Sequence, residues 1–137
     1  MYAKQIIFAA LSAATVAIAA PTPGLIDHAI CSKIINTLID GLKTTISDTL
    51  LISGGAPPAA ALLRTSLVVV DDIWETQTKA TAAISNQQIA DVTTNLVTVQ
   101  SLLTGTDAET KTALSALTLA QTQLTLVAGG NCETKDI

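Results

Sequence analysis

Aromatic residues, histidine, cysteine and charge are all scarce in this chain of 137 residues. Aromatic residues make up 2% of it and charged residues 13%, with two cysteines and one histidine. Two cysteines and one histidine are too few ligands for a zinc site built from Cys and His or for an iron–sulfur cluster. The formal net charge of −4 argues against nucleic acid as a partner, because phosphate binding needs a basic surface. We therefore expect no metal, no cofactor and no nucleic acid.

The N-terminal segment has the pattern of a cleaved signal peptide. Lys4 supplies a positive charge, and an apolar run of 14 residues extends from Ile6 to Ala19. Ala17 and Ala19 place small residues at the −3 and −1 positions of a cleavage site. A membrane-spanning helix needs roughly 20 apolar residues, so the run is too short for an anchor, and a retained signal anchor is the weaker alternative. We predict that residues 1–19 are a signal peptide and that the protein is secreted and extracellular.

One domain with short flanking segments is the natural organisation of a chain of this length. Residues 20–30 are predicted to form an extended leader and the start of the first helix, since Pro21 and Pro23 cannot lie inside a helix. Residues 31–132 are the predicted helical bundle domain, and residues 133–137 form a C-terminal tail.

The first half of the domain predicts two amphipathic helices, because apolar residues recur at steps of three and four. The apolar face of the first consists of Cys31, Ile34, Ile35, Leu38, Ile39, Leu42, Ile46 and Leu50. We expect Gly54–Gly55 to end this helix and Pro57–Pro58 to separate it from the next. The segment Leu67–Val70 has strand propensity, but the helical period around it favours a helix. That helix would bury Leu62, Leu63, Val69, Val70, Ile73, Trp74, Ala80 and Ile84.

The second half predicts two more helices, each begun by a capping box. Ser85 and Gln88 match the first box, and Thr106 and Glu109 match the second. The apolar residues follow the alternating steps of three and four that pack helices together. They are Ile89, Val92, Leu96, Val99 and Leu103 in the third helix and Ala113, Leu117, Ala120, Leu124 and Val127 in the fourth.

Four helices with short connections predict an all-α fold, an antiparallel four-helix bundle. In such a bundle the start of the first helix and the end of the last lie at the same pole, which brings Cys31 and Cys132 together. A secreted protein with two cysteines is expected to oxidise them to a disulfide. The alternative, a reactive thiol pair, lacks the Cys-x-x-Cys spacing.

Residues that could support catalysis are few. The densest acidic cluster consists of Asp71, Asp72 and Glu75. A glycosidase needs one carboxyl group held protonated in an apolar environment, whereas this cluster lies on a polar helix face. Trp74, on the apolar face, is expected to fill the core. His28 and Asp27 are adjacent, but no Gly-x-Ser-x-Gly motif accompanies them. We predict that the protein is not an enzyme and has no catalytic residues.

The segment from Ser85 to Ala128 is unusually poor in charge. Its 44 residues include four charged residues and 20 that are Ser, Thr, Asn or Gln. Four aliphatic residues also fall outside the predicted buried faces, namely Val97, Leu102, Leu119 and Leu126. Scattered exposed aliphatic side chains are ordinary. A second apolar stripe on a charge-poor surface is instead typical of adsorption, self-association or a lipid-lined interior. The sequence leaves both interpretations open.

The composition and helix pattern resemble those of the hydrophobic surface binding proteins of filamentous fungi, a group that includes the cell wall galactomannoproteins. The similarity extends from about Ile34 to Val127, through the helix–Gly-Gly–helix opening at Leu51–Gly55 and the later Ala/Thr/Leu-rich helices. It implies a helical bundle that adsorbs to hydrophobic surfaces or holds lipid between its helices, with cell wall association and without catalytic residues. The alternative is a secreted fungal effector, a virulence protein that acts through a host protein. In either case we expect a monomer or weak self-association.

Overall fold

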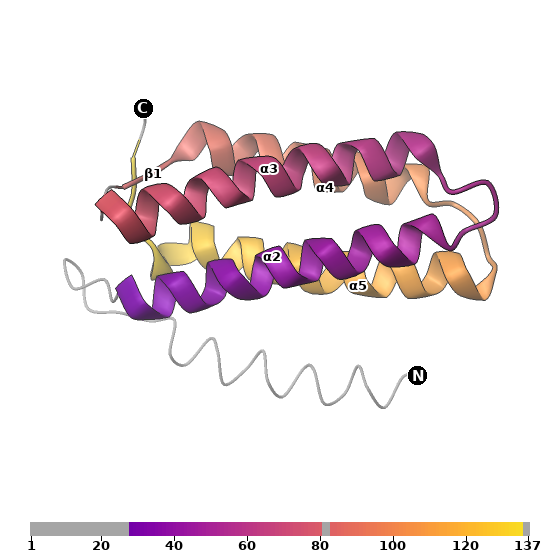
Figure 1. The fold of residues 1–137 in the computed structure, drawn as a ribbon, viewed down its shortest axis with the longest axis horizontal. Helices are drawn as coiled ribbons and strands as arrows, with labels where there is room; N and C mark the ends of the chain where they lie inside the picture. The colour runs from indigo at the N-terminus through magenta and orange to yellow at the C-terminus, as the bar shows by residue number, and fades with distance from the viewer. Residues whose placement is uncertain (1–27, 81–82, 136–137) are drawn as a thin grey trace.

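A computed structural model describes residues 28–80 and 83–135 of the chain (Figure 1). The four helices are α2 (His28–Leu50), α3 (Pro57–Ala80), α4 (Asn86–Leu102) and α5 (Ala108–Leu126). A wide helical turn, η1 (Val127–Asn131), continues α5. Two strands of two residues each, β1 (Ile84–Ser85) and β2 (Thr134–Lys135), pair in parallel. The described residues form the predicted all-α bundle, and the predicted signal peptide lies outside them.

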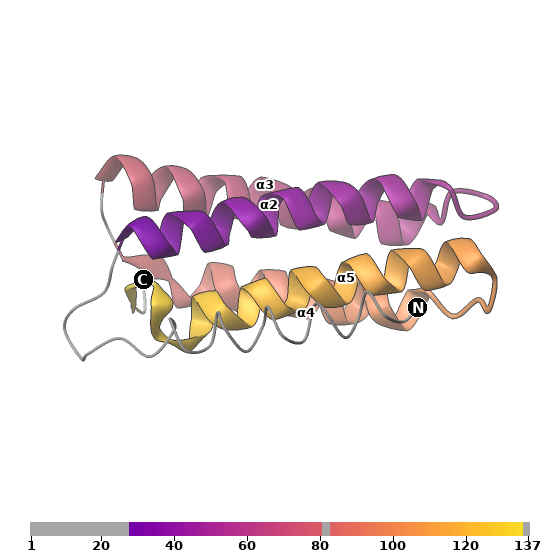
Figure 2. The same ribbon diagram turned by 90° about the horizontal axis from the view of Figure 1, so that it is seen from below.

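The helices run back and forth between two ends of the molecule, which we call the disulfide pole and the loop pole (Figure 1). The disulfide pole holds the start of α2 and the end of α5, together with β1 and β2. The loop pole holds the α2–α3 loop, residues 51–56, and the α4–α5 loop, residues 103–107. Each helix packs against its neighbours in the chain, and α2 also packs against α5, which closes the bundle (Figure 2).

The core confirms the helical period predicted for the second half of the domain. All ten apolar residues predicted to be buried there are buried, from Ile89 to Val127. Leu67–Val70 lies inside α3, which confirms that its helical period outweighs its strand propensity. Helices α2 and α5 approach closely at Gly41 and Ala120, since a Cβ added at Gly41 would lie 3.5 Å from the Cβ of Ala120, in ordinary van der Waals contact.

The bounds of α3 differ from the prediction at both ends. Pro57 and Pro58 are its first two residues rather than a separator. Proline fits there because the first N–H groups of a helix have no partner within the helix. The helix ends at Ala80, so the prediction that it continues to Ile84 was wrong. The backbone N–H of Ile84 instead donates to the carbonyl of Glu133 at 2.7 Å, which ties the α3–α4 connection to the C-terminal segment.

One of the two predicted N-caps is confirmed. The Ser85 side chain accepts hydrogen bonds from the backbone N–H groups of Gln87 and Gln88, at 3.2 and 3.4 Å. The second capping box was wrong by one residue, because Asp107 rather than Thr106 caps α5. A carboxylate is a stronger hydrogen-bond acceptor than a hydroxyl, and it also interacts favourably with the positive end of the helix dipole.

Polar residues complete the buried face of α2 toward the loop pole. Leu50, predicted to be buried, is 46% exposed, whereas Thr45 and Thr49 are fully buried. These threonines continue the series of Leu38 and Leu42 at steps of three and four, so they occupy the centre of the face and Leu50 lies at its edge. The pattern of apolar residues alone could not predict that threonine occupies these buried positions.

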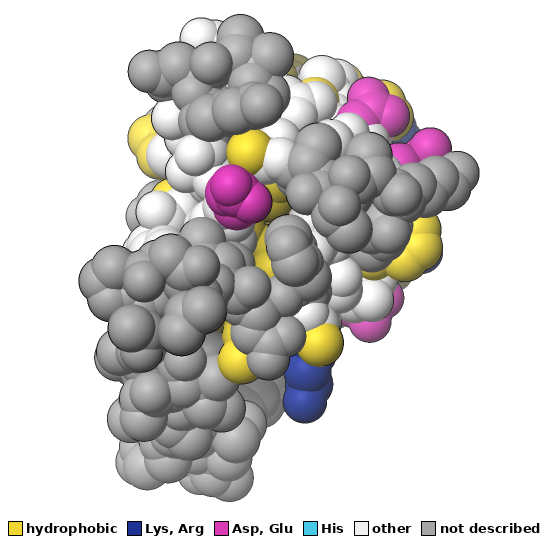
Figure 3. Space-filling view, turned by 90° about the vertical axis from the view of Figure 1, so that its left-hand side faces the viewer, with side chains coloured by type: hydrophobic (Ala, Val, Ile, Leu, Met, Phe, Trp, Pro, Cys, Tyr) yellow, Lys and Arg dark blue, Asp and Glu magenta, His cyan; other side chains and the backbone are white. Residues whose placement is uncertain are grey.

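The predicted disulfide is confirmed. Cys31 and Cys132 are bonded, with their Cα atoms 5.1 Å apart across 101 residues of sequence, and both are buried. Figure 3 shows the molecule from the disulfide pole, where hydrophobic and acidic side chains are interspersed on the surface of the described residues. The bond joins the first helix to the segment that follows the last one.

We predict that the protein purified without reductant takes up no alkylating reagent unless it is first reduced, as measured by intact mass. The chain-entropy model of a closed loop of this size suggests that the Cys31→Ala/Cys132→Ala variant loses roughly 4–5 kcal/mol of unfolding free energy. Denaturant unfolding of the two proteins would measure this loss. Two alkylated cysteines in the unreduced protein would contradict the account.

Candidate functional site

Among the residues considered for catalysis, the structure describes the acidic cluster and Trp74 on α3 and the backbone position of His28. Asp71, Asp72 and Glu75 are exposed on α3, the solvated position that their pattern predicts. Trp74 is half-buried and packs against the core, as predicted. His28 is the first residue of α2, whereas its neighbour Asp27 lies outside the described residues.

Two further classes of site are absent from the residues that the structure describes. They contain no group of three or more His, Cys, Asp or Glu residues that could hold a metal ion. No helix among them has the length and apolar character needed to cross a membrane.

The charge-poor surface predicted from the sequence is formed by the outer faces of α4 and α5, which we call the α4–α5 surface. Val97 is 55% exposed, Leu102 44% and Leu119 39%. Leu126 was also predicted to be exposed, and this was wrong, since it belongs to the core cluster where α5 continues into η1. The second apolar stripe is therefore shorter than predicted.

Threonine side chains make the α4–α5 surface less polar than its composition suggests. Five of them donate their hydroxyl hydrogen to the carbonyl four residues earlier in the same helix, at 2.8–3.0 Å; they are Thr93, Thr98, Thr118, Thr122 and Thr125. Four of the five are exposed and Thr122 is half-buried. Because the hydroxyl hydrogen is used within the helix, these side chains offer water an acceptor oxygen and a methyl group but no donor. Mid-helix threonine is the sequence signal for this bond.

Uncharged side chains connect α4 and α5. The Gln121 amide nitrogen donates to the Gln100 amide oxygen at 3.3 Å, and both residues belong to the α4–α5 surface. A long, exposed hydrogen bond between neutral groups holds two helices together weakly. This bond therefore does not make the surface polar enough to exclude an apolar partner.

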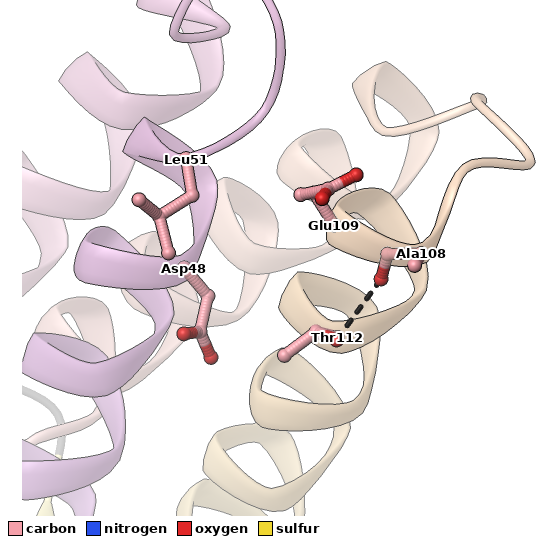
Figure 4. A pocket seen from close by; sticks show the side chains of 5 residues that line it. All are labelled: Asp48, Leu51, Ala108, Glu109 and Thr112. Atoms are coloured by element: carbon pink, nitrogen blue, oxygen red, sulfur yellow. Dashed lines mark hydrogen bonds between the residues drawn. The ribbon is translucent and has the colours of Figure 1, made fainter.

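A pocket of about 240 Å³ lies at the loop pole between α2 and α5 (Figure 4). It is lined by Asp48, Leu51, Ala108, Glu109 and Thr112. The Thr112 hydroxyl donates to the Ala108 carbonyl at 2.9 Å, so it is already engaged within α5. Ligand pockets usually measure about 300–1,000 Å³ and are mostly apolar. A smaller pocket with two carboxylates does not resemble an acyl-chain site.

Comparisons with known proteins give no relative for this chain: no protein-family model, no curated protein and no solved structure matches it. The resemblance to hydrophobic surface binding proteins therefore stays a prediction. Function has to be inferred from the surface that the fold presents.

Asp107 caps α5 beside the pocket. We expect its carboxylate to make the stability of the protein depend on pH. Asp107 accepts hydrogen bonds from the Thr110 hydroxyl at 2.7 Å and from the Thr110 backbone N–H at 3.0 Å. These bonds lower the pKa of Asp107 below its ordinary value of 3.8. Because folding lowers the pKa of Asp107, its carboxylate contributes fully to the stability of the folded state at pH values above the ordinary pKa. This contribution is lost as the pH falls through the lowered pKa.

We predict that Asp107→Ala lowers the melting temperature at neutral pH, and that the difference from the wild type shrinks at an acidic pH below the lowered pKa of Asp107, where the carboxylate is protonated. Thermal unfolding followed by circular dichroism at the two pH values measures this. Asp40→Ala, which removes an exposed aspartate from the middle of α2, is the control. An equal effect of the two substitutions at neutral pH would refute the role of the cap.

Proposed function

We propose that this protein is a secreted, non-catalytic helical bundle that binds hydrophobic surfaces or lipid through its α4–α5 surface. Residues 1–19 would direct it out of the cell, and association with the cell wall fits the same role. The protein acts as a monomer or with weak self-association.

The observation that carries the proposal is the combination of exposed aliphatic residues and internally bonded threonines on two charge-poor helices. Val97 and Leu119 are exposed on α4 and α5. These helices carry few of the charged groups that bind water at a protein surface. Few ions need to be desolvated when such a surface meets an apolar one, which lowers the main cost of adsorption. The α4–α5 surface is therefore better suited to an apolar contact than a helix with a charged outer face.

The energetics do not require a charged anchor. Burial of each CH₂ group contributes about 0.8 kcal/mol, and full burial of a Val or Leu side chain contributes about 1.5–3 kcal/mol. Several half-exposed aliphatic side chains and threonine methyl groups acting together would hold the protein on an apolar surface or against an acyl chain.

Helix α3 supplies an internal comparison. Val68 is 60% exposed, slightly more than Val97, but the same helix carries the exposed carboxylates of Asp71, Asp72 and Glu75. An apolar surface that covered Val68 would bring these charges close to a medium of low dielectric constant, which is unfavourable. The proposal therefore assigns adsorption to α4 and α5 and not to α3.

We predict that the Val97→Thr/Leu119→Gln variant binds hydrophobic beads about tenfold more weakly than the wild type, because two half-exposed aliphatic side chains are lost. Val68→Thr is the matched control and should bind within about twofold of the wild type. Binding isotherms on alkylated beads, with underivatised beads as a blank, measure both.

Equal weakening by the double variant and by Val68→Thr would overturn the assignment to the α4–α5 surface. Binding no stronger than to the blank beads would overturn the proposed function itself. The second result would favour the alternative, a secreted effector that acts through a host protein.

A further inference from the structure

The connections between the helices are distributed unequally between the two poles. At the loop pole the chain links α2 to α3 and α4 to α5, which makes two hairpins. At the disulfide pole three links join the two hairpins: the Cys31–Cys132 bond, the chain between α3 and α4, and the pairing of β1 with β2. One end of the bundle is thus tied together covalently, whereas at the other the two hairpins meet only through packing.

The α2–α5 interface is less apolar toward the loop pole, although α3 and α4 bury Leu63, Leu96 and Val99 in that half. In residues 43–50 of α2 and 108–116 of α5, the buried residues are Thr45, Thr49, Thr110, Ala113 and Ala116. Toward the disulfide pole the same helices bury large aliphatic side chains, among them Ile35, Leu38, Leu117 and Leu124. Because stabilisation follows the apolar area that is buried, the loop-pole half gains less from closure.

Two buried hydroxyl groups oppose closure directly. The Oγ1 atom of Thr49 and the Oγ atom of Ser66 are buried without a hydrogen-bond partner, and both residues are fully buried. Thr49 lies on α2, one turn from the loop pole, and Ser66 lies in the loop-pole half of α3. A buried polar group without a partner is destabilising, and opening to water would hydrate it.

Polar contacts do not close this end either. Asp48 of α2 and Glu109 of α5 both line the loop-pole pocket, so the two hairpins present like charges there (Figure 4). The side-chain hydrogen bonds between helices include Ser32–Gln77 in one hairpin and Gln100–Gln121 in the other. Neither of them joins the two hairpins at the loop pole.

We infer that the bundle opens at its loop pole, with the two hairpins hinged at the disulfide pole. Opening hydrates the hydroxyl groups of Thr49 and Ser66. It also exposes core residues next to Leu51 and Leu102, which are 70% and 44% exposed in the closed form. This motion is a property of the fold and does not depend on the proposed function, although an apolar partner at the loop pole would stabilise the open form.

Native-state hydrogen exchange of the intact, disulfide-bonded protein tests the inference without any ligand. We expect amides in the loop-pole halves, residues 43–50, 57–66, 96–102 and 108–116, to exchange faster than those in the disulfide-pole halves of the same helices. Both halves contain helix ends, so fraying affects the comparison equally.

Thr49→Val distinguishes a concerted opening from fraying of α2 alone. Valine has nearly the same shape and removes the unpartnered hydroxyl, so it should favour the closed form and slow exchange about tenfold in the loop-pole halves of all four helices. Thr45→Val is the matched control, because Thr45 is equally buried but already donates to the Gly41 carbonyl at 2.7 Å. It should not slow exchange.

Three results would overturn the inference. The first is equal exchange in the two halves of the wild type. The second is protection by Thr49→Val that is confined to α2. The third is equal protection by Thr49→Val and Thr45→Val. If Thr49→Val does not fold, Ser66→Ala removes the other unpartnered hydroxyl and should likewise slow exchange beyond its own helix. None of these measurements involves adsorption, so they stand apart from the test of the proposed function.

Discussion

The bond between Cys31 and Cys132 is the constraint on which the rest of the fold depends. It holds the start of α2 against the end of η1, and the C-terminal strand β2 then lies beside β1 between α3 and α4. One covalent link and one short strand pair thereby connect all four helices at a single pole. Aliphatic side chains, with Trp74 packed against them, can then form the core, because the link reduces the conformational entropy of the unfolded chain.

The same constraint explains why the opposite pole can tolerate poor packing. Threonine and alanine at the loop-pole end of α2 and α5 would be costly in a bundle that had no other support. The covalent link and the large aliphatic side chains of α2 and α5 lie toward the disulfide pole, whereas the unpartnered hydroxyl groups of Thr49 and Ser66 lie toward the loop pole. The outer face of α4 and α5 is independent of this division, since its low charge and internally bonded threonines extend along both helices.

Periodicity and cysteine positions were enough to predict the helices, the buried faces of α4 and α5, and the disulfide. They failed where a polar residue takes an apolar position, as at Thr49, because a pattern of apolar residues does not register a buried hydroxyl. They also failed at Asp107, where a better acceptor stood one residue beyond the predicted cap. The β1–β2 pair could not be predicted, since two residues carry no strand period and their meeting depends on the tertiary position of the disulfide.

The candidate surface could be predicted only in part, as a charge-poor stretch with extra aliphatic residues. The proposal that this surface binds apolar partners is tested most directly on protein recovered from culture medium. The sample is weighed by native mass spectrometry before and after contact with hydrophobic beads. We expect either an added mass from bound lipid or strong depletion of the protein by the beads. Protein that carries no lipid and stays in solution as fully as an inert control protein would contradict it.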